Sequence, residues 1–388
     1  MRSPRSSEVL KKFNFLRGTQ LVWGRPPSVD IAIIDEVGSD ELIELLPNQS
    51  THVIDLSGKS TNVRALIRSF LRGQTDLYGY LVAYLELIQP KIAMTLIDTT
   101  PFFYRLKNDF PNLTTIAVQN GWRAFETKRD FEAERTELRV DHLLCFGEVS
   151  RDLYSQSIKG NFHIVGSFRS NKVPIKSNNN SRKVALISTL RSKVQLTDRV
   201  PTYAGNQKVT YSEIFERRLK LAKHVAEFCR DHSLSLVVLG KDPYDDREQS
   251  LYASTLSEVD IDWEFRSRTE LLSNYLHLNE VRIAVSTSSS LGYEALGRGI
   301  RTAFFMLDPE VTGNFGDRFG WPEPLEDSGE IWANFLDRKT THEILNRLHH
   351  MSDHAWEEVR SRYVPRMISS NPENTVFKGL VEQALAER

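Results

Sequence analysis

A strand–turn–helix–strand pattern near residue 290 constrains the fold more than any other feature of the chain. The apolar run Val281–Val285 indicates a buried strand, and Thr302–Met306 indicates a second one. Between them lie a turn of hydroxyl residues, Ser286–Ser290, and a short stretch of helix-forming residues, Tyr293–Leu296. The glycines that follow can end this helix by adopting positive φ. The pattern predicts a parallel βαβ unit.

The hydroxyl-rich turn is a candidate anion-binding loop. At a helix N-terminus such a turn presents free backbone N–H groups and hydroxyl donors to an anion, and the helix dipole adds partial positive charge. Glu294, one turn inside the helix, could accept hydrogen bonds from a ribose. A nucleotide phosphate fits this chemistry, although an ordinary Ser-capped helix would have the same pattern. The candidate nucleotide-binding residues are Ser286, Thr287, Ser288, Ser289, Ser290, Gly292, Tyr293 and Glu294.

Length and composition set broad limits on the class of protein. The 388 residues suffice for two ordinary domains, and 40% of them are hydrophobic. No apolar stretch suggests a membrane span or a secretory signal. The only cysteines, Cys145 and Cys229, lie in apolar surroundings, which favours buried thiols in a reducing compartment. A net charge of −1 argues against a general nucleic-acid binder.

Two polar segments divide the chain into domains. Residues 1–28 form a basic N-terminal segment that could touch anionic lipid at the inner membrane face, or could simply be solvated. The Asn-rich run 173–182 cannot bury a core and reads as a linker or hinge. Strand and helix signals alternate in residues 29–172 and again in 183–388. We therefore expect an α/β protein of two doubly wound, parallel-sheet (Rossmann-like) domains facing a ligand cleft.

Polar residues end two predicted strands of the first domain. Asp98 follows the strand Ile92–Ile97, so we expect its carboxylate to emerge at the cleft; as an alternative it could cap the helix that starts at Pro101. Gln119 and Asn120 end the next strand, where their amides could bind sugar hydroxyls or merely form a turn. Arg123 could pair with a phosphate or a sugar carboxylate, or could be a surface arginine.

The second domain offers further phosphate-binding candidates after its strands. Ser188 and Arg191 follow the first strand of this domain, and Lys241 follows the strand Leu234–Leu239. A fixed cation there could stabilise the charge that develops on a leaving phosphate in place of a metal. The acidic cluster at 242–248 lacks the spacing of a calcium loop, and the histidines lack zinc spacing, so we assign no metal. There is no P-loop, G-x-G-x-x-G or G-x-S-x-G motif.

Three segments carry a resemblance to a known family. Ile97–Leu106, Ile116–Arg123 and Ser286–Gly299 resemble segments of bacterial surface-carbohydrate (O-antigen and capsule) biosynthesis glycosyltransferases of the GT-B type. The third is similar to a segment of capsule Kdo transferases. The layout of elements resembles GT-B from about residue 29 to 385.

The resemblance implies a function and an assignment of roles. It implies a cytoplasmic enzyme that moves a sugar from a CMP-, UDP- or GDP-linked donor to a surface glycan or lipid-linked acceptor. Such an enzyme could also bind peripherally at the inner membrane. Asp98, Gln119, Asn120 and Arg123 would then be catalytic, and the residues of the second domain would bind the donor without a further cofactor. A nucleotide-sugar epimerase on the same fold, or a non-catalytic glycan- or nucleotide-binding subunit, remain the alternatives.

Overall fold

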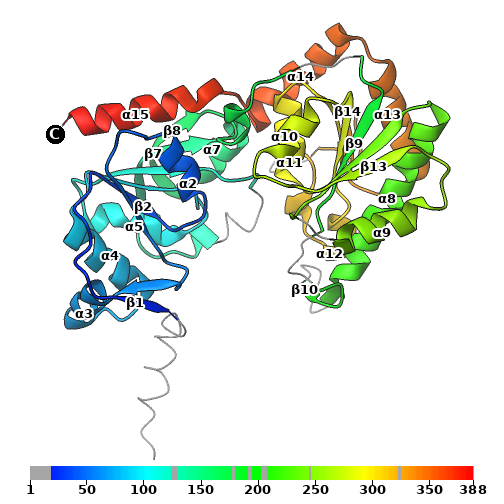
Figure 1. Ribbon diagram of the computed structural model, residues 1–388. Coiled ribbons are helices and arrows are strands. Elements are labelled where there is room, and N and C mark those ends of the chain that lie inside the picture. The colour runs from blue at the N-terminus through cyan, green and yellow to red at the C-terminus, as the bar shows by residue number, and fades with distance from the viewer. Residues whose placement is uncertain are drawn as a thin grey trace, which may run out of the picture.

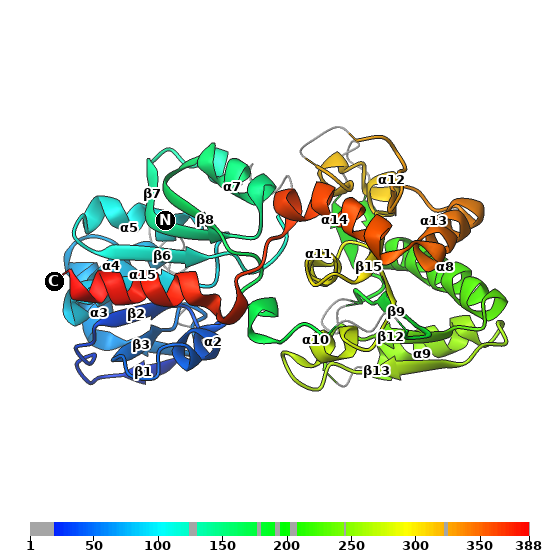
Figure 2. The same cartoon turned by 90° about the horizontal axis from the view of Figure 1, so that it is seen from above.

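The computed structural model describes residues 19–123, 130–176, 180–190, 195–201, 208–243, 246–321 and 325–387. These residues form two α/β domains, each built on a parallel sheet of six strands (Figures 1 and 2). The predicted fold class, two doubly wound parallel-sheet domains, is confirmed.

The N-terminal sheet has the strand order β3-β2-β5-β6-β7-β8. Side chains alternate between its two faces, because successive residues of a strand point to opposite sides. Ala32 and Ile34 of β2 join one apolar cluster, and Ile31 and Ile33 join the other. Its strands are β2 (Ile31–Ile34), β3 (Thr51–Ile54), β5 (Ile92–Thr95), β6 (Thr114–Val118), β7 (Leu138–Cys145) and β8 (Ile158–Ile164).

The C-terminal sheet has the order β13-β12-β9-β14-β15-β16, which is the 3-2-1-4-5-6 order of a Rossmann fold. The order reverses between β9 and β14, and ligands bind such sheets outside the carboxyl ends of the strands at this point. Its strands are β9 (Lys183–Ile187), β12 (Ser235–Leu239), β13 (Trp263–Arg266), β14 (Ile283–Ser286), β15 (Arg301–Phe305) and β16 (Trp332–Ala333).

Helices cover both faces of each sheet (Figure 2). Those between the N-terminal strands are α2 (Ser39–Glu44), α3 (Val63–Leu71), α4 (Leu77–Ile88), α5 (Pro101–Asp109) and α7 (Glu148–Ser155). Those of the C-terminal domain are α8 (Tyr211–Asp231), α9 (Asp246–Leu256), α10 (Ser273–Leu278), α11 (Ser290–Gly297), α12 (Pro309–Thr312), α13 (Arg338–His350) and α14 (Asp353–Met367). Short 3-10 turns are η2 (Ser170–Lys172), η3 (Phe315–Asp317) and η4 (Pro372–Asn374). None of the described helices combines the length and the hydrophobicity that a bilayer crossing requires.

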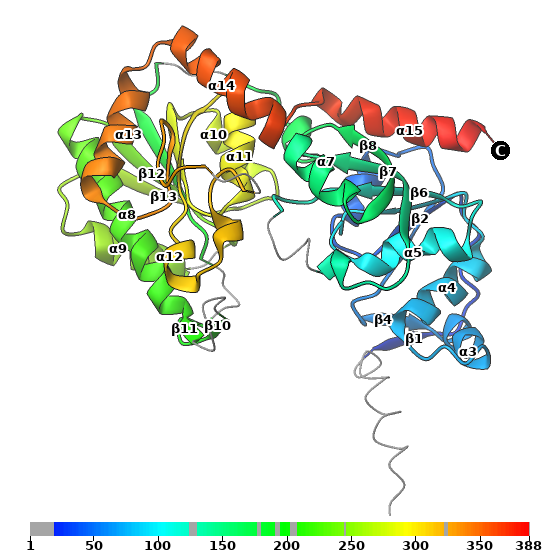
Figure 3. The same cartoon turned by 180° about the vertical axis from the view of Figure 1, so that it is seen from behind.

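The last helix, α15 (Thr375–Ala386), does not belong to the C-terminal domain. Phe377 and Val381 pack in the apolar cluster on one face of the N-terminal sheet, and α15 lies along that domain (Figure 3). The chain therefore crosses between the domains a second time after α14. Asn171, just before the predicted linker, hydrogen-bonds Asn374 at 3.0 Å, so the two crossings lie together. The expectation that residues 183–388 all belong to the C-terminal domain is therefore wrong for α15.

The pattern near residue 290 forms the predicted elements. β14 leads through the hydroxyl turn into α11, and β15 follows in parallel with β14. Gly299 ends the turn after the helix with a φ of 88°, whereas Gly297 is still helical. Four further strands lie outside the two large sheets, β1 (Gln20–Val22) with β4 (Ser60–Asn62) and β10 (Arg199–Pro201) with β11 (Lys208–Thr210). Neither these four strands nor β16 were predicted.

Candidate functional site

A cavity of about 870 Å³ lies between the domains, at the carboxyl ends of strands from both sheets. The N-terminal domain contributes the segments after β5, β6 and β8. The C-terminal domain contributes α8 and the segments after β9, β12, β13, β14 and β15. The N-terminal lining residues are Thr99, Asn120, Gly121, Trp122, Arg123 and Arg169. The polar C-terminal ones include Ser188, Thr189, Arg218, Lys241, Arg268, Asn274, Tyr275, Ser288, Ser289, Ser290, Glu294, Asp308 and Asp317.

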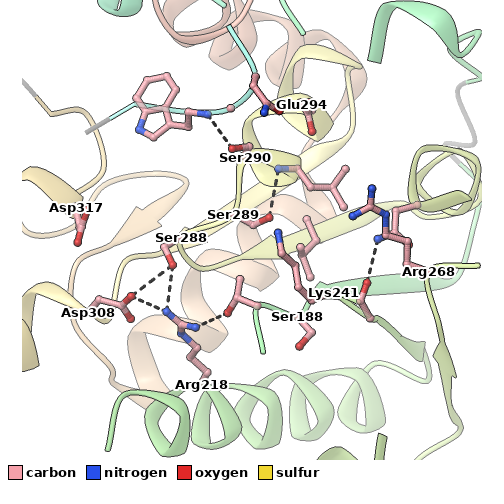
Figure 4. Close-up of a pocket in the computed structure, with 18 of the residues that line it drawn as sticks. Ser188, Arg218, Lys241, Arg268, Ser288, Ser289, Ser290, Glu294, Asp308 and Asp317 are labelled. Atoms are coloured by element: carbon pink, nitrogen blue, oxygen red, sulfur yellow. Dashed lines mark hydrogen bonds and ion pairs between the residues drawn. The ribbon is translucent and has the colours of Figure 1, made fainter. Parts of the chain in front are cut away.

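The three serines that begin α11 line the cavity, and each hydroxyl has a different partner. Ser289 caps the helix, because its hydroxyl oxygen accepts a hydrogen bond from the Leu291 N–H at 3.3 Å. Ser288 contacts both Arg218 and Asp308 (Figure 4), with its hydroxyl oxygen 3.2 Å from the guanidinium. Of the other residues predicted here, Ser286, Thr287, Gly292 and Tyr293 do not line the cavity.

Ser290 connects the two domains across the cavity. Its hydroxyl oxygen accepts a hydrogen bond from the backbone N–H of Trp122 at 2.8 Å. A Cβ added to Gly121 would lie 3.0 Å from the same oxygen, so the N-terminal loop approaches α11 as closely as a glycine permits. The Ser290 hydroxyl is therefore occupied by the opposite domain.

Glu294 lines the cavity and is almost fully buried. Its Oε1 accepts hydrogen bonds from the Ser167 hydroxyl and, at 2.9 Å, from the Tyr275 hydroxyl. Burial raises the pKa of the Glu294 carboxyl above its ordinary value, and these hydrogen bonds offset burial only in part.

Arg218 and Asp308 are cavity residues that the sequence analysis missed. The Arg218 guanidinium lies 2.5 Å from the Asp308 carboxylate and donates to the Thr189 hydroxyl at 2.5 Å. The pair thus joins the segments after β9, β14 and β15. A sequence signal existed: Arg218 lies on the apolar face of α8, between the buried Phe215 and Leu221. A charge at a core position of an amphipathic helix needs a buried partner.

Further cations reach the cavity from both domains. Lys241 and Ser188 line it, as predicted, and Arg268 was not predicted. Arg169 enters from the N-terminal domain, where Glu41 holds its guanidinium through three contacts of 2.8–3.0 Å. Arg191 lies outside the described residues.

Asp98 is neither at the cleft nor a helix cap, so both expectations for its side chain are wrong. Its exposed fraction is 0%. Its carboxylate accepts hydrogen bonds from the Asn120 N–H at 3.0 Å, from the Arg123 Nε at 2.5 Å, and from the Tyr154 hydroxyl. The residue before α5 is Thr100. The buried carboxylate of Asp98 therefore fixes the loop after β6 through these hydrogen bonds.

The other residues of this loop divide between core and cavity. Gln119 is buried: its Oε1 accepts from the Phe146 N–H at 2.7 Å, and its Nε2 donates to the Gly121 carbonyl at 2.8 Å. Asn120 and Arg123 line the cavity. Arg123 is no surface arginine, because Asp98 and Tyr154 fix its guanidinium.

The ligand atoms of His232, His349 and His350 lie within 4.8 Å of one another between the ends of α8 and α13. None of the three lines the cavity.

Comparison with solved structures defines the class of fold. A variant of the wall teichoic acid polymerase TagF with CDPG aligns with a TM-score of 0.51 and 10% identity over 99% of this chain and 94% of that one. The UDP-GlcNAc 2-epimerase of Neisseria meningitidis bound to UDP-GlcNAc aligns with a TM-score of 0.50 and 12% identity over 92% and 90%. At these identities the likeness is one of fold, and the fold is GT-B-like.

A family model gives the more specific assignment. The model described as "putative O-antigen biosynthesis protein" matches residues 116–385. This range covers more than half of the chain, and the chain belongs to this family. No curated protein matches the sequence.

Proposed function

We propose that this protein is a cytoplasmic glycosyltransferase that moves a sugar from a nucleotide-sugar donor to a surface glycan or a lipid-linked acceptor. Membership of an O-antigen biosynthesis family and the GT-B-like fold support this class. The observation that carries the proposal is a cavity between two Rossmann-like domains that combines a helix N-terminus, several cations and a buried carboxyl group.

The donor nucleotide would bind to the C-terminal half of the cavity. Its phosphates would lie at the N-terminus of α11, beside Ser288 and Ser289, where the helix dipole favours an anion. Because Oε1 of Glu294 already takes two hydrogen bonds, its Oε2 would accept from a ribose hydroxyl. Asn274 Oδ1 and Asp308 Oδ1 are buried without a hydrogen-bond partner in the described part of the chain, and a ligand could satisfy them.

The departing phosphate needs positive charge that is fixed before the reaction begins. Lys241 and Arg268 line the phosphate side of the cavity, and Arg218 supports Ser288 there. We propose that these side chains provide the positive charge for the departing phosphate without a metal or another cofactor. The acceptor sugar would face Asn120 in the N-terminal domain, while Asp98 and Gln119 act as positioning residues.

Thermal shift with CMP, CDP, UDP, GDP and dTDP tests the donor site, because a ligand of the native state raises its stability. Lys241→Met should weaken binding of the preferred nucleoside diphosphate by about 1.5–3 kcal/mol, the range for a charge-assisted hydrogen bond. Binding of the matching nucleoside should stay unchanged and is the control. Equal diphosphate affinity in the variant and the wild type would remove Lys241 from the site.

Product analysis with and without acceptor separates the proposed function from its alternatives. A transferase forms a new glycan only when the acceptor is present. An epimerase converts the nucleotide sugar without any acceptor, and a binding subunit holds the nucleotide with no turnover. Either of the last two results, obtained with lipid-linked acceptors present, would overturn the proposal.

A further inference from the structure

Six large apolar side chains are exposed at one end of the N-terminal domain, and none of them lines the cavity. Their exposed fractions run from 41% for Val22 to 79% for Leu71. We call this group the β1–α3 patch; it consists of Leu21, Val22, Trp23, Ile67, Phe70 and Leu71. Soluble surfaces expose single apolar residues commonly, but a contiguous group rimmed by polar residues marks an interaction site.

The patch is contiguous although its two halves are 44 residues apart in sequence. β1 pairs in parallel with β4, and β4 runs directly into α3. Arg64 in the first turn of α3 donates from its Nε to the Trp23 carbonyl at 3.3 Å. Figures 1 and 3 both show β1 and α3 together at the same end of the domain.

α3 is apolar on its exposed side as well as on its buried side. Val63 and Ala65 are buried against the domain, as in any surface helix. Ile67, Phe70 and Leu71 are spaced i, i+3 and i+4, so they share the outer face. Packing within the described chain accounts for the inner face alone, and the outer face needs another apolar environment.

Cations surround the patch. Arg25, Arg64, Arg68 and Arg72 are all exposed. Glu86 pairs with Arg68 at 2.6 Å and also with Arg72, so two of the four guanidinium groups share one carboxylate. The chain that enters β1 adds charge of the same sign, since residues 1–18 contain five lysines and arginines against Glu8 alone.

We propose that the β1–α3 patch docks on the surface of an anionic lipid bilayer. A helix with aromatic and aliphatic side chains on one face and arginines beside them lies in the interface plane, with its apolar face below the headgroups. The cations attract anionic headgroups. A second copy of this chain fits less well, because a two-fold contact would bring the arginines of both copies together. The inference stands independently of the proposed transfer reaction, although docking would bring the protein to lipid-linked acceptors.

Co-sedimentation of the full chain with vesicles tests the proposal. Vesicles of phosphatidylcholine mixed with an equal part of phosphatidylglycerol should bind the protein, and vesicles of phosphatidylcholine alone should bind it much less. The triple variant Trp23→Ser, Phe70→Ser, Leu71→Ser should lower the partition coefficient by on the order of 100-fold or more, because each change removes a large apolar group. Arg64→Gln should lower it roughly fivefold, and raised salt should remove this difference.

Matched controls separate the patch from general stickiness and misfolding. The double variant Leu276→Ser, Val376→Ser changes exposed apolar residues elsewhere and should bind vesicles like the wild type. All variants should keep the wild-type melting temperature and nucleotide response, so a failed donor assay leaves this test intact. Unchanged vesicle binding of the triple variant would overturn the proposal. Two other outcomes would also overturn it. The first is that the variant Lys11→Gln, Lys12→Gln, Arg17→Gln loses vesicle binding while the triple variant keeps it. The second is that the wild type is a dimer that does not bind vesicles and that dissociates in the triple variant.

Discussion

Trp122 of the N-terminal domain stacks on Tyr293 of α11, with ring centroids 4.0 Å apart and ring planes 10° from parallel. The backbone N–H of Trp122 also donates a hydrogen bond to the Ser290 hydroxyl oxygen. The loop after β6 and the first turn of α11 are thus in direct contact, and movement of one domain must move the candidate phosphate loop or break this contact.

Trp122→Ala should loosen the two domains. An aromatic pair contributes about 0.5–1.5 kcal/mol beyond its buried area, so separated arrangements should gain population by roughly 2- to 13-fold. Small-angle scattering should show a larger radius of gyration for the variant, and a smaller one when nucleotide is added to the wild type. Trp23→Ala, which changes an exposed tryptophan outside the cavity, is the control. Equal radii for Trp122→Ala and wild type under both conditions would show that the stack does not couple the domains.

Asp98→Asn should destabilise the protein rather than act on turnover alone. Arg123 would lose its negative partner inside the protein, and breaking a buried ion pair costs about 3–5 kcal/mol. Urea unfolding measures the change in the free energy of unfolding. Asp152→Asn, which breaks the exposed pair with Arg151, should change it by less than about 0.5 kcal/mol.

The double variant Asp98→Leu, Arg123→Met tests the same pair without leaving a charge behind. It should recover part of the lost stability, because neither charge remains buried. Its loop would still lack the hydrogen bond to the Asn120 N–H, so acceptor use should stay impaired. A stable Asp98→Asn protein with low turnover would instead favour the catalytic role expected from the sequence.

The pKa of Glu294 gives stability a pH dependence of predictable sign. Burial holds this pKa above its ordinary value of 4.5, so the folded protein binds more protons than the unfolded chain between the two pKa values. Stability from this group is therefore fully present below pH 4.5 and falls as the pH rises through the raised pKa. The free energy of unfolding, measured by urea titration from pH 4 to 9, should decline less steeply in Glu294→Gln over that window. Identical slopes would contradict the assignment.

Gly292→Ala should disturb the junction between β14 and α11. The added Cβ would lie 2.2 Å from the Ser286 Oγ and 2.4 Å from its Cβ. Overpacking of this kind costs about 1–3 kcal/mol, and Ser286→Gly in the same chain should relieve much of it. Gly379→Ala in α15 meets nothing within 4 Å and serves as the control, with stability unchanged or slightly raised. Loss of thermal stability in the control but not in Gly292→Ala would refute the packing argument.

The sequence by itself determined the fold class, because strand and helix periodicities are local properties of the chain. The runs at 281–285 and 302–306 correspond to β14 and β15, and the helix between them begins in the hydroxyl turn. Positions after strand ends also identified Ser188, Lys241, Asn120 and Arg123 as cavity residues, since the carboxyl ends of parallel strands share one edge.

Only the tertiary structure decided which polar side chains face the cavity and which are buried beneath it. Asp98 follows a strand as Ser188 does, yet Arg123 and Tyr154 surround its carboxylate, and no local pattern encodes partners 25 and 56 residues away. Arg218 on α8 meets Asp308 from 90 residues further along. Which domain α15 packs on depended on the apolar face of the N-terminal sheet that Phe377 and Val381 cover. The sequence of α15 shows that it has an apolar side, but not which surface buries that side.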